Sequence, residues 1–388
     1  MGENRNIGQQ QAVSVFGNPE SSIKLIRNHG QLCKVKQALL CPCAAKNFGS
    51  PSIHCTVCNG DGYIYTYQRR FKVIDEDSQL CENVISPYYI PILDVSKVQN
   101  VTSEVQGGIR DIDVVSFDDN TITLAESLLQ FEKRRVTYTF DGWTYVEEEE
   151  LDVDAVNGIM YVNDVVFDAG YQSSNPLNAY ADIAQIVKIW NSDTMAEIET
   201  YTFSGRAIFT DETIVAGKMK IEYYYADLTQ VINTDLITRN ENTDWTRELT
   251  SGETRLAFYP FMDIARGDIV VIAATVLYKN EAFTHLKDID KLWEMEILEL
   301  NNVIIDESGN KYFLNTDYIL QGRHVKWISS NKPAVNAVCT VRYGYKPAFI
   351  VFEDNPQPNT LENKNYPKIC LVKSWSKISK DDIAKLVM

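Results

Sequence analysis

Residues 339–349 read CTVRYGYKPAF, and every second residue from Val341 through Tyr343 to Tyr345 is a large apolar or aromatic side chain. Such an alternation places these side chains on one face of a β-strand, because successive residues of a strand point to opposite faces. Aromatic and β-branched residues are enriched in strands, and the chain contains 21 Tyr and 6 Trp. The stretch predicts a half-buried strand, and the composition extends this prediction to a mainly β protein.

The same design occurs at two earlier places in the chain. RRVTYTF (134–140) and MKIEYYY (219–225) show the same alternation, and each follows a shorter apolar run. These shorter runs are NTITL (120–124) and GRAIFT (205–210), and GRHVKWI (322–328) is their counterpart before residues 339–349. We interpret the pattern as the duplication of a small β-domain. The alternative is that any β-rich chain offers pairs of strands that look alike.

A chain of 388 residues is long enough for several domains. We predict a mainly β fold with several small β-sandwich or barrel-like domains, an N-terminal zinc-knuckle segment and short helices. The predicted divisions are a flexible N-terminal arm with a short helix (1–30), the cysteine knuckle segment (31–75), one or more β-domains (76–227), a polar linker (228–253), and a C-terminal β-domain with a short terminal helix (254–388).

Local signals predict where the helices begin and end. Apolar residues in 21–40 favour a short helix that breaks near Gly30 and continues as an extended run. Ser379 and Asp382 form a capping box that predicts the terminal helix. The most apolar run, IVVIAATVLY (269–278), is typical of one buried strand and is far shorter than the ~20 residues of a membrane span.

The net charge and the first residues argue against a DNA-coating protein and against a secreted one. The formal net charge is -16, which argues against a surface that coats DNA without regard to sequence. The opening residues MGENRNIGQQQ have neither a basic region nor an apolar core, so we expect no secretory signal. We therefore expect synthesis in a reducing cytosol, where clustered cysteines bind metal more often than they form disulfides.

The stretch CPCAAKNFGSPSIHCTVCNGDGY (41–63) concentrates cysteines in two short motifs. Cys41 and Cys43 form a C-x-C, and Cys55 and Cys58 form a C-x-x-C. Four thiolates are the usual ligand set of a tetrahedral structural zinc site, so we predict that these four residues bind Zn²⁺. A redox pair, a disulfide knot and an iron–sulfur cluster are the alternatives.

Two other residues lie close to this cluster. His54 is an alternative ligand, but its position beside Cys55 would strain the C-x-x-C motif. Cys33 is expected in the hydrophobic core. A closed site of four thiolates leaves no open position for water, so we expect it to stabilise a small segment rather than to catalyse a reaction.

We do not expect an enzyme. The sequence contains no P-loop, GxGxxG, GxSxG or HExxH motif. Its four histidines, at positions 29, 54, 285 and 324, are scattered without metal-binding spacing. The acidic run Glu147 to Glu150 is expected to be a solvated strand edge that discourages edge-to-edge pairing.

Two stretches resemble known families. The segment CTVCNGDG (55–62) is similar to one cysteine knuckle of the zinc domain of DnaJ-type chaperones, although this chain has one such unit and no J-domain motif. DYILQGRHVKW (317–327), followed by a Pro-containing loop and VRYGYKP (341–347), resembles small β-modules in structural proteins of tailed bacteriophages. The CPC and CxxCxGxGY pair (41–63) also resembles a cysteine knuckle near the start of many phage virion proteins.

The resemblance implies a virion component, most simply a neck, head-to-tail connector or tail-associated ring protein. The implied partners are portal, connector or tail subunits and further copies of the chain in a ring. No membrane is implied, and nucleic acid enters only by passage through a channel. The implied location is the virion, assembled in the host cytoplasm. The alternative is a receptor- or glycan-binding tail or baseplate protein, with Trp143, Trp190 and Trp245 as sugar platforms unless these side chains serve in packing.

Overall fold

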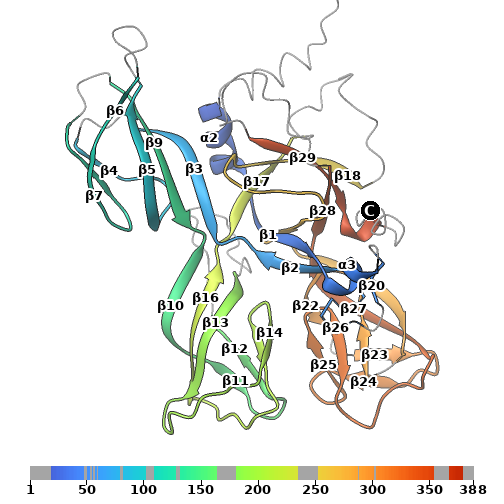
Figure 1. The fold of residues 1–388 in the computed structure, drawn as a ribbon. Helices are drawn as coiled ribbons and strands as arrows, with labels where there is room; N and C mark the ends of the chain where they lie inside the picture. Colours follow the sequence, from blue (N-terminus) through green and yellow to red (C-terminus); the bar gives the residue numbers. More distant parts are fainter. Residues whose placement is uncertain are drawn as a thin grey trace, which may run out of the picture.

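The computed structural model describes residues 19–47, 50–52, 55, 57–58, 60–78, 82–101, 109–127, 132–163, 181–234, 252–286, 288–300, 303–353 and 367–378. It confirms a mainly β fold made of several small sheets. Two short α-helices, α2 (Pro19–His29) and α3 (Pro42–Lys46), lie near the start of the described chain. Figure 1 shows three groups of strands projecting from a central group.

The central group is an antiparallel barrel. Its strands follow the order β17-β18-β29-β28-β19-β1, and β1 closes the ring by pairing with β17. Strand β2 extends the sheet beside the far half of β1. Closure removes the open sheet edges that would otherwise expose unpaired backbone groups. The bounds are β1 (Gln31–Leu40), β2 (Tyr63–Tyr67), β17 (Thr229–Asn233), β18 (Glu253–Phe258), β19 (Ile269–Ile272), β28 (Ala348–Glu353) and β29 (Lys368–Ser374), with the short helix η2 (Trp375–Lys377) after β29.

The break between α2 and β1 occurs at the predicted glycine. Gly30 N donates to the Ile26 carbonyl oxygen at 2.7 Å, and a Cβ at Gly30 would lie 2.3 Å from that same oxygen. Only glycine allows so close an approach of backbone to backbone. The side chains on either side of the break, Ile26 and Cys33, are fully buried in the barrel core, as expected for Cys33.

Three β-modules share one topology, and they extend the predicted duplication to three copies. Each has a sheet of longer strands, here called the larger sheet, in which the last strand lies between the first strand and a middle strand. Each also has a smaller sheet built on three short strands, to which module II adds a fourth. Figure 1 shows module I (residues 70–141) in light blue to teal, module II (143–226) in green and module III (277–346) in orange. The larger sheets contain the orders β3-β9-β5, β10-β16-β13 and β20-β27-β22, and the smaller sheets contain β4-β8-β7, β12-β15-β14 and β21-β26-β25.

The strands of the modules are short, with the last strand of each among the longest. In module I they are β3 (Arg70–Ser78), β4 (Val84–Ile85), β5 (Ile92–Asn100), β6 (Arg110–Asp111), β7 (Val114–Phe117), β8 (Ile122–Leu124) and β9 (Arg134–Asp141). In module II they are β10 (Trp143–Glu150), β11 (Asp152–Asp154), β12 (Ile159–Tyr161), β13 (Asp182–Asn191), β14 (Thr202–Ser204), β15 (Ala207–Phe209) and β16 (Met219–Ala226). In module III they are β20 (Leu277–Thr284), β21 (Ile289–Lys291), β22 (Glu296–Leu300), β23 (Val303–Asp306), β24 (Lys311–Phe313), β25 (Tyr318–Gln321), β26 (His324–Trp327) and β27 (Val338–Lys346).

The register of the middle strands supports a common origin for the three modules. In each, an isoleucine of the middle strand opposes an aromatic residue near the end of the last strand, and the register shifts directly after it. A β-bulge at one fixed position is a structural feature of the module, because it bends the strand at that point. The opposed pairs are Ile92 with Phe140, Ile183 with Tyr225, and Ile297 with Tyr345.

Each module also has its own hydrophobic core, built around the alternation seen in the sequence. Tyr138, Tyr223 and Tyr343 are buried in modules I, II and III, with exposed fractions of 0%, 0% and 1%. The apolar residue two positions earlier is also buried in every copy, at Val136, Ile221 and Val341. The predicted inward face of the last strand is therefore confirmed in all three modules.

The structure can also be compared with the predicted linker, buried strand, N-terminal arm and terminal helix. Residues 228–253, predicted as a linker, begin with strand β17 of the barrel, and 235–251 lie outside the described residues. The prediction of one buried strand over 269–278 is wrong, because β19 ends at Ile272 and Tyr278 belongs to β20 with 65% of its surface exposed. The predicted arm before residue 19 and the terminal helix from Ser379 also lie outside the described residues.

Candidate metal centre

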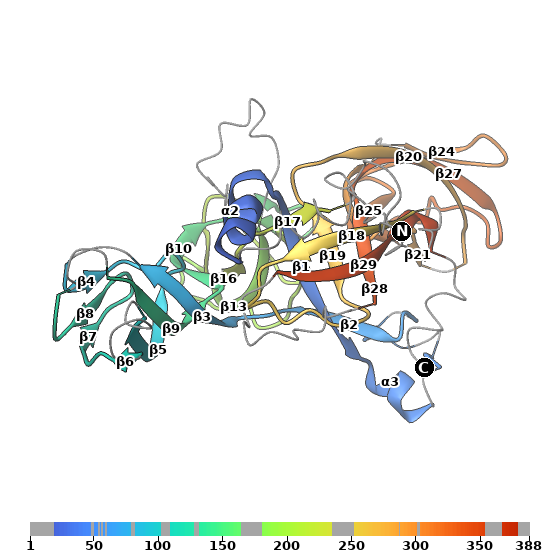
Figure 2. The ribbon, with the colours of Figure 1, turned by 90° about the horizontal axis from the view of Figure 1, so that it is seen from above.

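Backbone pairing between β1 and β2 brings the two cysteine motifs together. Leu40 pairs with Tyr63 at the end of this hairpin, and Cys41 N donates to the Gly62 carbonyl oxygen at 2.8 Å. Cys41 then starts α3, with proline at the first helical position, where the missing N–H costs nothing. Figure 2 shows α3 beyond the end of this hairpin.

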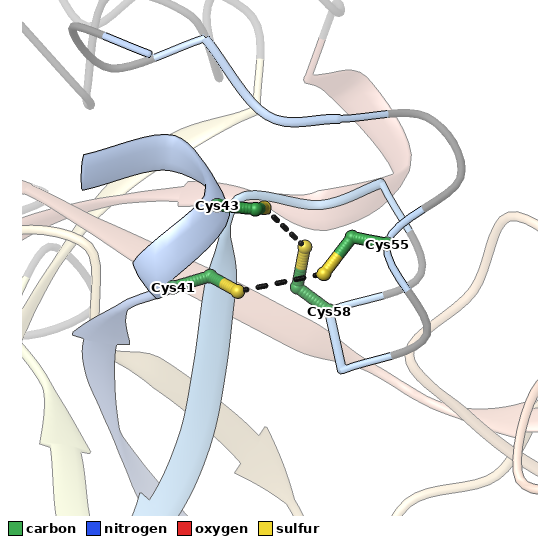
Figure 3. Close-up of side chains that lie close together, drawn as sticks. All are labelled: Cys41, Cys43, Cys55 and Cys58. Carbon is green, nitrogen blue, oxygen red and sulfur yellow. Dashed lines mark hydrogen bonds between the residues drawn. The ribbon is translucent and has the colours of Figure 1, made fainter. Parts of the chain in front are cut away.

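The four sulfur atoms converge on one point. Cys41 Sγ lies 3.7 Å from Cys55 Sγ, and Cys43 Sγ lies 3.5 Å from Cys58 Sγ (Figure 3). All four sulfur atoms lie within 4.8 Å of one another. A tetrahedral ion with Zn–S bonds of ~2.3 Å would separate its sulfurs by about 3.8 Å. The ligand set therefore fits a single metal ion in both chemistry and size.

A disulfide does not account for this arrangement. An S–S bond is about 2.05 Å long, whereas the closest sulfur pairs lie at 3.5 and 3.7 Å and all four cysteines are free thiols. Both close pairs join one cysteine of the C-x-C to one of the C-x-x-C. The two motifs therefore act as one site, in which each contributes two ligands.

The local backbone prepares the site for a cation. Hydrogen bonds from the backbone N–H groups of Cys58 and Val57 lower the pKa of the Cys55 thiol to about 6. Burial raises the pKa of Cys41 and Cys58. The pKa of Cys43 is also raised. A metal binds thiolates, so ion binding at neutral pH would displace protons chiefly from Cys41, Cys43 and Cys58.

The turn after the second motif depends on glycine and positions Asp61. Gly60 and Gly62 have φ angles of +83° and +82°, which side chains rarely tolerate, and Asp61 N donates to the Cys58 carbonyl oxygen at 2.9 Å. The Asp61 carboxylate forms ion pairs with Lys291 and Arg323 of module III. The cysteine segment is thereby attached to module III as well as to the barrel.

Arg323 is itself held firmly at this contact. It is 7% exposed, and its guanidinium carbon lies 5.7 Å from the ring centre of Trp375. Sequence reasoning missed the Asp61 contact, because Asp61 and Arg323 are 262 residues apart in the chain. The Gly322–Arg323 pair was visible in the sequence only as part of a repeated strand pattern.

The structure describes only some of the other residues of this segment. His54 lies outside the described residues. Between the two cysteine motifs, Ala44 is fully buried and Lys46 is exposed, while Phe48 also lies outside the described residues.

A second polar cluster, also missed from the sequence, joins the barrel to modules II and III. Lys34 Nζ lies 2.5 Å from Asp182 Oδ1 and 2.6 Å from Glu296 Oε1. Lys36 Nζ lies 3.1 Å from Asp182 Oδ2, and the Tyr67 hydroxyl donates to the same carboxylate. Although burial opposes it, the charges of Lys34 and Lys36 hold the pKa of Asp182 well below its usual range.

Comparisons with known proteins add no relative. No protein-family model matches the chain, and no curated protein matches it. Within the described part of the chain, no helix has both the length and the apolar character needed to cross a bilayer. The candidate sugar platforms also lose support, because Trp190 is 8% exposed and the Trp143 ring has the Arg69 guanidinium carbon 5.1 Å from its centre. Trp245 lies outside the described residues.

Proposed function

We propose that this chain is an architectural subunit of a tailed-phage particle, most simply of a neck, head-to-tail connector or tail-associated ring. The observation that carries the proposal is the construction of the chain: one β-module occurs three times on a single closed barrel. The residues that resemble phage β-modules, 317–327 and 341–347, form β25, β26 and β27 of module III. Modules I and II repeat this topology without repeating that sequence.

Contacts between the parts favour a rigid building block. Lys34 joins the barrel to Asp182 of module II and Glu296 of module III, and Asp61 joins the cysteine segment to module III. Fixed modules present fixed surfaces, which a closed ring requires because each subunit must meet its neighbour at one angle. The partners would be portal, connector or tail subunits and further copies of this chain, assembled in the host cytoplasm.

Zinc is the metal we propose for the four-cysteine site. Four thiolates in a closed tetrahedral set are typical of structural zinc, whose d¹⁰ shell imposes no other geometry and undergoes no redox change. Cys41, Cys43, Cys55 and Cys58 would hold the ion, which would take the place of a hydrophobic core in this small segment.

Two measurements test the architectural role. Native mass spectrometry of the purified, metal-loaded chain should detect a closed oligomer, alone or with portal protein. Quantitative mass spectrometry of purified particles should find the chain in a fixed copy number that is a multiple of the ring size. A chain that remains monomeric with portal protein and is absent from particles would contradict the proposal.

A further inference from the structure

A cleft lies where modules II and III meet beside strand β1 of the barrel. Its volume is about 740 Å³, within the usual range for ligand sites. The hairpin turns of the two small sheets touch there, since a Cβ at Gly322 would lie 2.7 Å from Ser204 Oγ. Ile159 and Phe209 of module II pack with Ile319 of module III beside this contact. The walls therefore belong to two modules that are already packed together.

The cleft contains both hydrogen-bond donors and acceptors. Lys34 and Lys36 are paired with Asp182 and Glu296, so these four groups balance in charge. Glu296 Oε2 is buried without a hydrogen-bond partner, and Lys36 Nζ lies 3.9 Å from it. An unsatisfied buried carboxylate oxygen is costly and favours a ligand that can donate to it.

One wall of the cleft carries an exposed aromatic ring. Tyr278 is 65% exposed and pairs across the strands with Gly344. A Cβ at Gly344 would lie 3.3 Å from Tyr278 Cε1, so the ring lies against the space that a side chain would fill. An aromatic ring over a strand glycine is held in place on one face. The guanidinium carbon of Arg342 lies 5.9 Å from the centre of this ring, and Tyr278 remains 65% exposed.

Among the three modules, only module III has a glycine at this position of the last strand. The residue between the two inward-facing aromatics of the last strand is Thr139 in module I and Tyr224 in module II, but Gly344 in module III. In module II the matching pair is Tyr145 with Tyr224, whose ring centres lie 5.0 Å apart. Only module III combines the glycine with an exposed tyrosine at the paired position.

We propose that this cleft binds an oligosaccharide, with Tyr278 stacking on a sugar ring and Glu296 accepting a bond from a sugar hydroxyl. Hydroxyl groups both donate and accept, which suits a floor where ammonium and carboxylate groups alternate. A sugar ring also presents an apolar C–H face that an aromatic ring can cover. This inference is independent of the ring assembly proposed above.

Ligand-detected NMR on the full metal-loaded chain tests the proposal with maltotriose, cellotriose, chitotriose and mannotriose. At least one trisaccharide should receive saturation from the protein at millimolar concentration. Y278A should weaken its binding by about tenfold, or about 1.4 kcal/mol. Y278F should retain binding, because the ring remains.

Y145A is the matched control, since Tyr145 occupies the same repeat position in module II and is 45% exposed. It should leave trisaccharide binding unchanged. Failure of all four trisaccharides to bind, or equal effects of Y278A and Y145A, would overturn the proposal. So would binding of trialanine alone with the same dependence on Tyr278, because it would identify a peptide site.

Discussion

The Tyr223 hydroxyl donates to Glu149 Oε2 at 2.6 Å and thereby links the last strand of module II to its first strand. The same contact joins Tyr138 to Glu76 at 2.5 Å in module I and Tyr343 to Glu281 in module III. In every copy, the glutamate opposes the apolar residue two positions before the tyrosine. A buried tyrosine tip paired with a first-strand carboxylate is therefore part of the module, like its bulge.

Removal of the Tyr223 hydroxyl should show how much this hydrogen bond contributes to stability. Y223F leaves Glu149 Oε2 without its donor at a partly buried site, so we expect a loss of about 1 kcal/mol in the stability of module II. Hydrogen exchange followed by mass spectrometry resolves the three modules. Y145F is the control, because the Tyr145 hydroxyl bonds to Glu222 on the exposed side of the same sheet. Equal effects of the two variants would contradict a special role for the buried pair.

The buried Lys34 cluster should be far more sensitive than a surface ion pair. K34M leaves the carboxylates of Asp182 and Glu296 without their closest cation, so we expect a loss of about 3–5 kcal/mol. K188M should cost less than about 1 kcal/mol, because Lys188 and Glu197 form an exposed pair at 3.1 Å. Chemical denaturation checks both values. Similar losses in the two variants would count against a role of the Lys34 cluster in holding the modules together.

The same cluster should resist acid. The folded pKa of Asp182 is depressed, so its stabilising contribution is present above the unfolded value of about 3.9 and is lost only as pH falls through the lower folded value. Small-angle scattering should therefore show an unchanged molecular shape from neutral pH down to about pH 4. An expansion between pH 7 and pH 5 would mean that this cluster does not hold the modules.

Asp227 should show the opposite pH dependence. Burial raises its pKa to about 6, while Thr144 Oγ1 donates to it at 2.8 Å. A carboxyl whose pKa is raised by folding destabilises the fold as pH rises from about 4 to about 6, because the charged form is the costly one. D227N removes this penalty, so its melting temperature relative to wild type should rise between pH 4.5 and pH 7.5. A constant difference would contradict the assignment.

Loss of the Asp61 charge should not impair metal binding. D61N removes the charge that meets Lys291 and Arg323, so the segment 41–62 should loosen from module III while its four cysteines remain in place. Hydrogen exchange should quicken at Leu292, whose N–H donates to the Arg323 carbonyl oxygen at 2.9 Å. D263N is the control, because Asp263 lies at an exposed site. Loss of metal in D61N would show that metal binding depends on the Asp61 ion pairs.

The sequence predicted what is local and missed what is distant. The alternation around Tyr343 and the break at Gly30 depend on residues within one turn or strand, so periodicity and glycine were sufficient. The spacing of the four cysteines likewise predicted their convergence. Closure of the barrel by β1 and β17 could not be predicted, because its register joins Gln31 to Val231, 200 residues away.

The polar contacts inside the protein could not be predicted from the sequence either. Glu149 lies in an acidic run expected to be solvated, and only the folded sheet shows that it accepts the Tyr223 hydroxyl. Lys34 gives no sign in the sequence that it meets Asp182 and Glu296, 148 and 262 residues away. Burial of a charge depends on which modules pack together, and no local pattern encodes that.

Metal analysis of the purified chain tests the central claim most directly, because the cysteine site connects the barrel hairpin to module III. Elemental analysis should find one zinc ion per chain, and C43S and C58S should each lose it together with the amide protection of residues 41–62. C370A should retain the ion, since Cys370 lies in the barrel core. A native chain without stoichiometric metal, or a C43S chain that holds as much as wild type, would contradict the account.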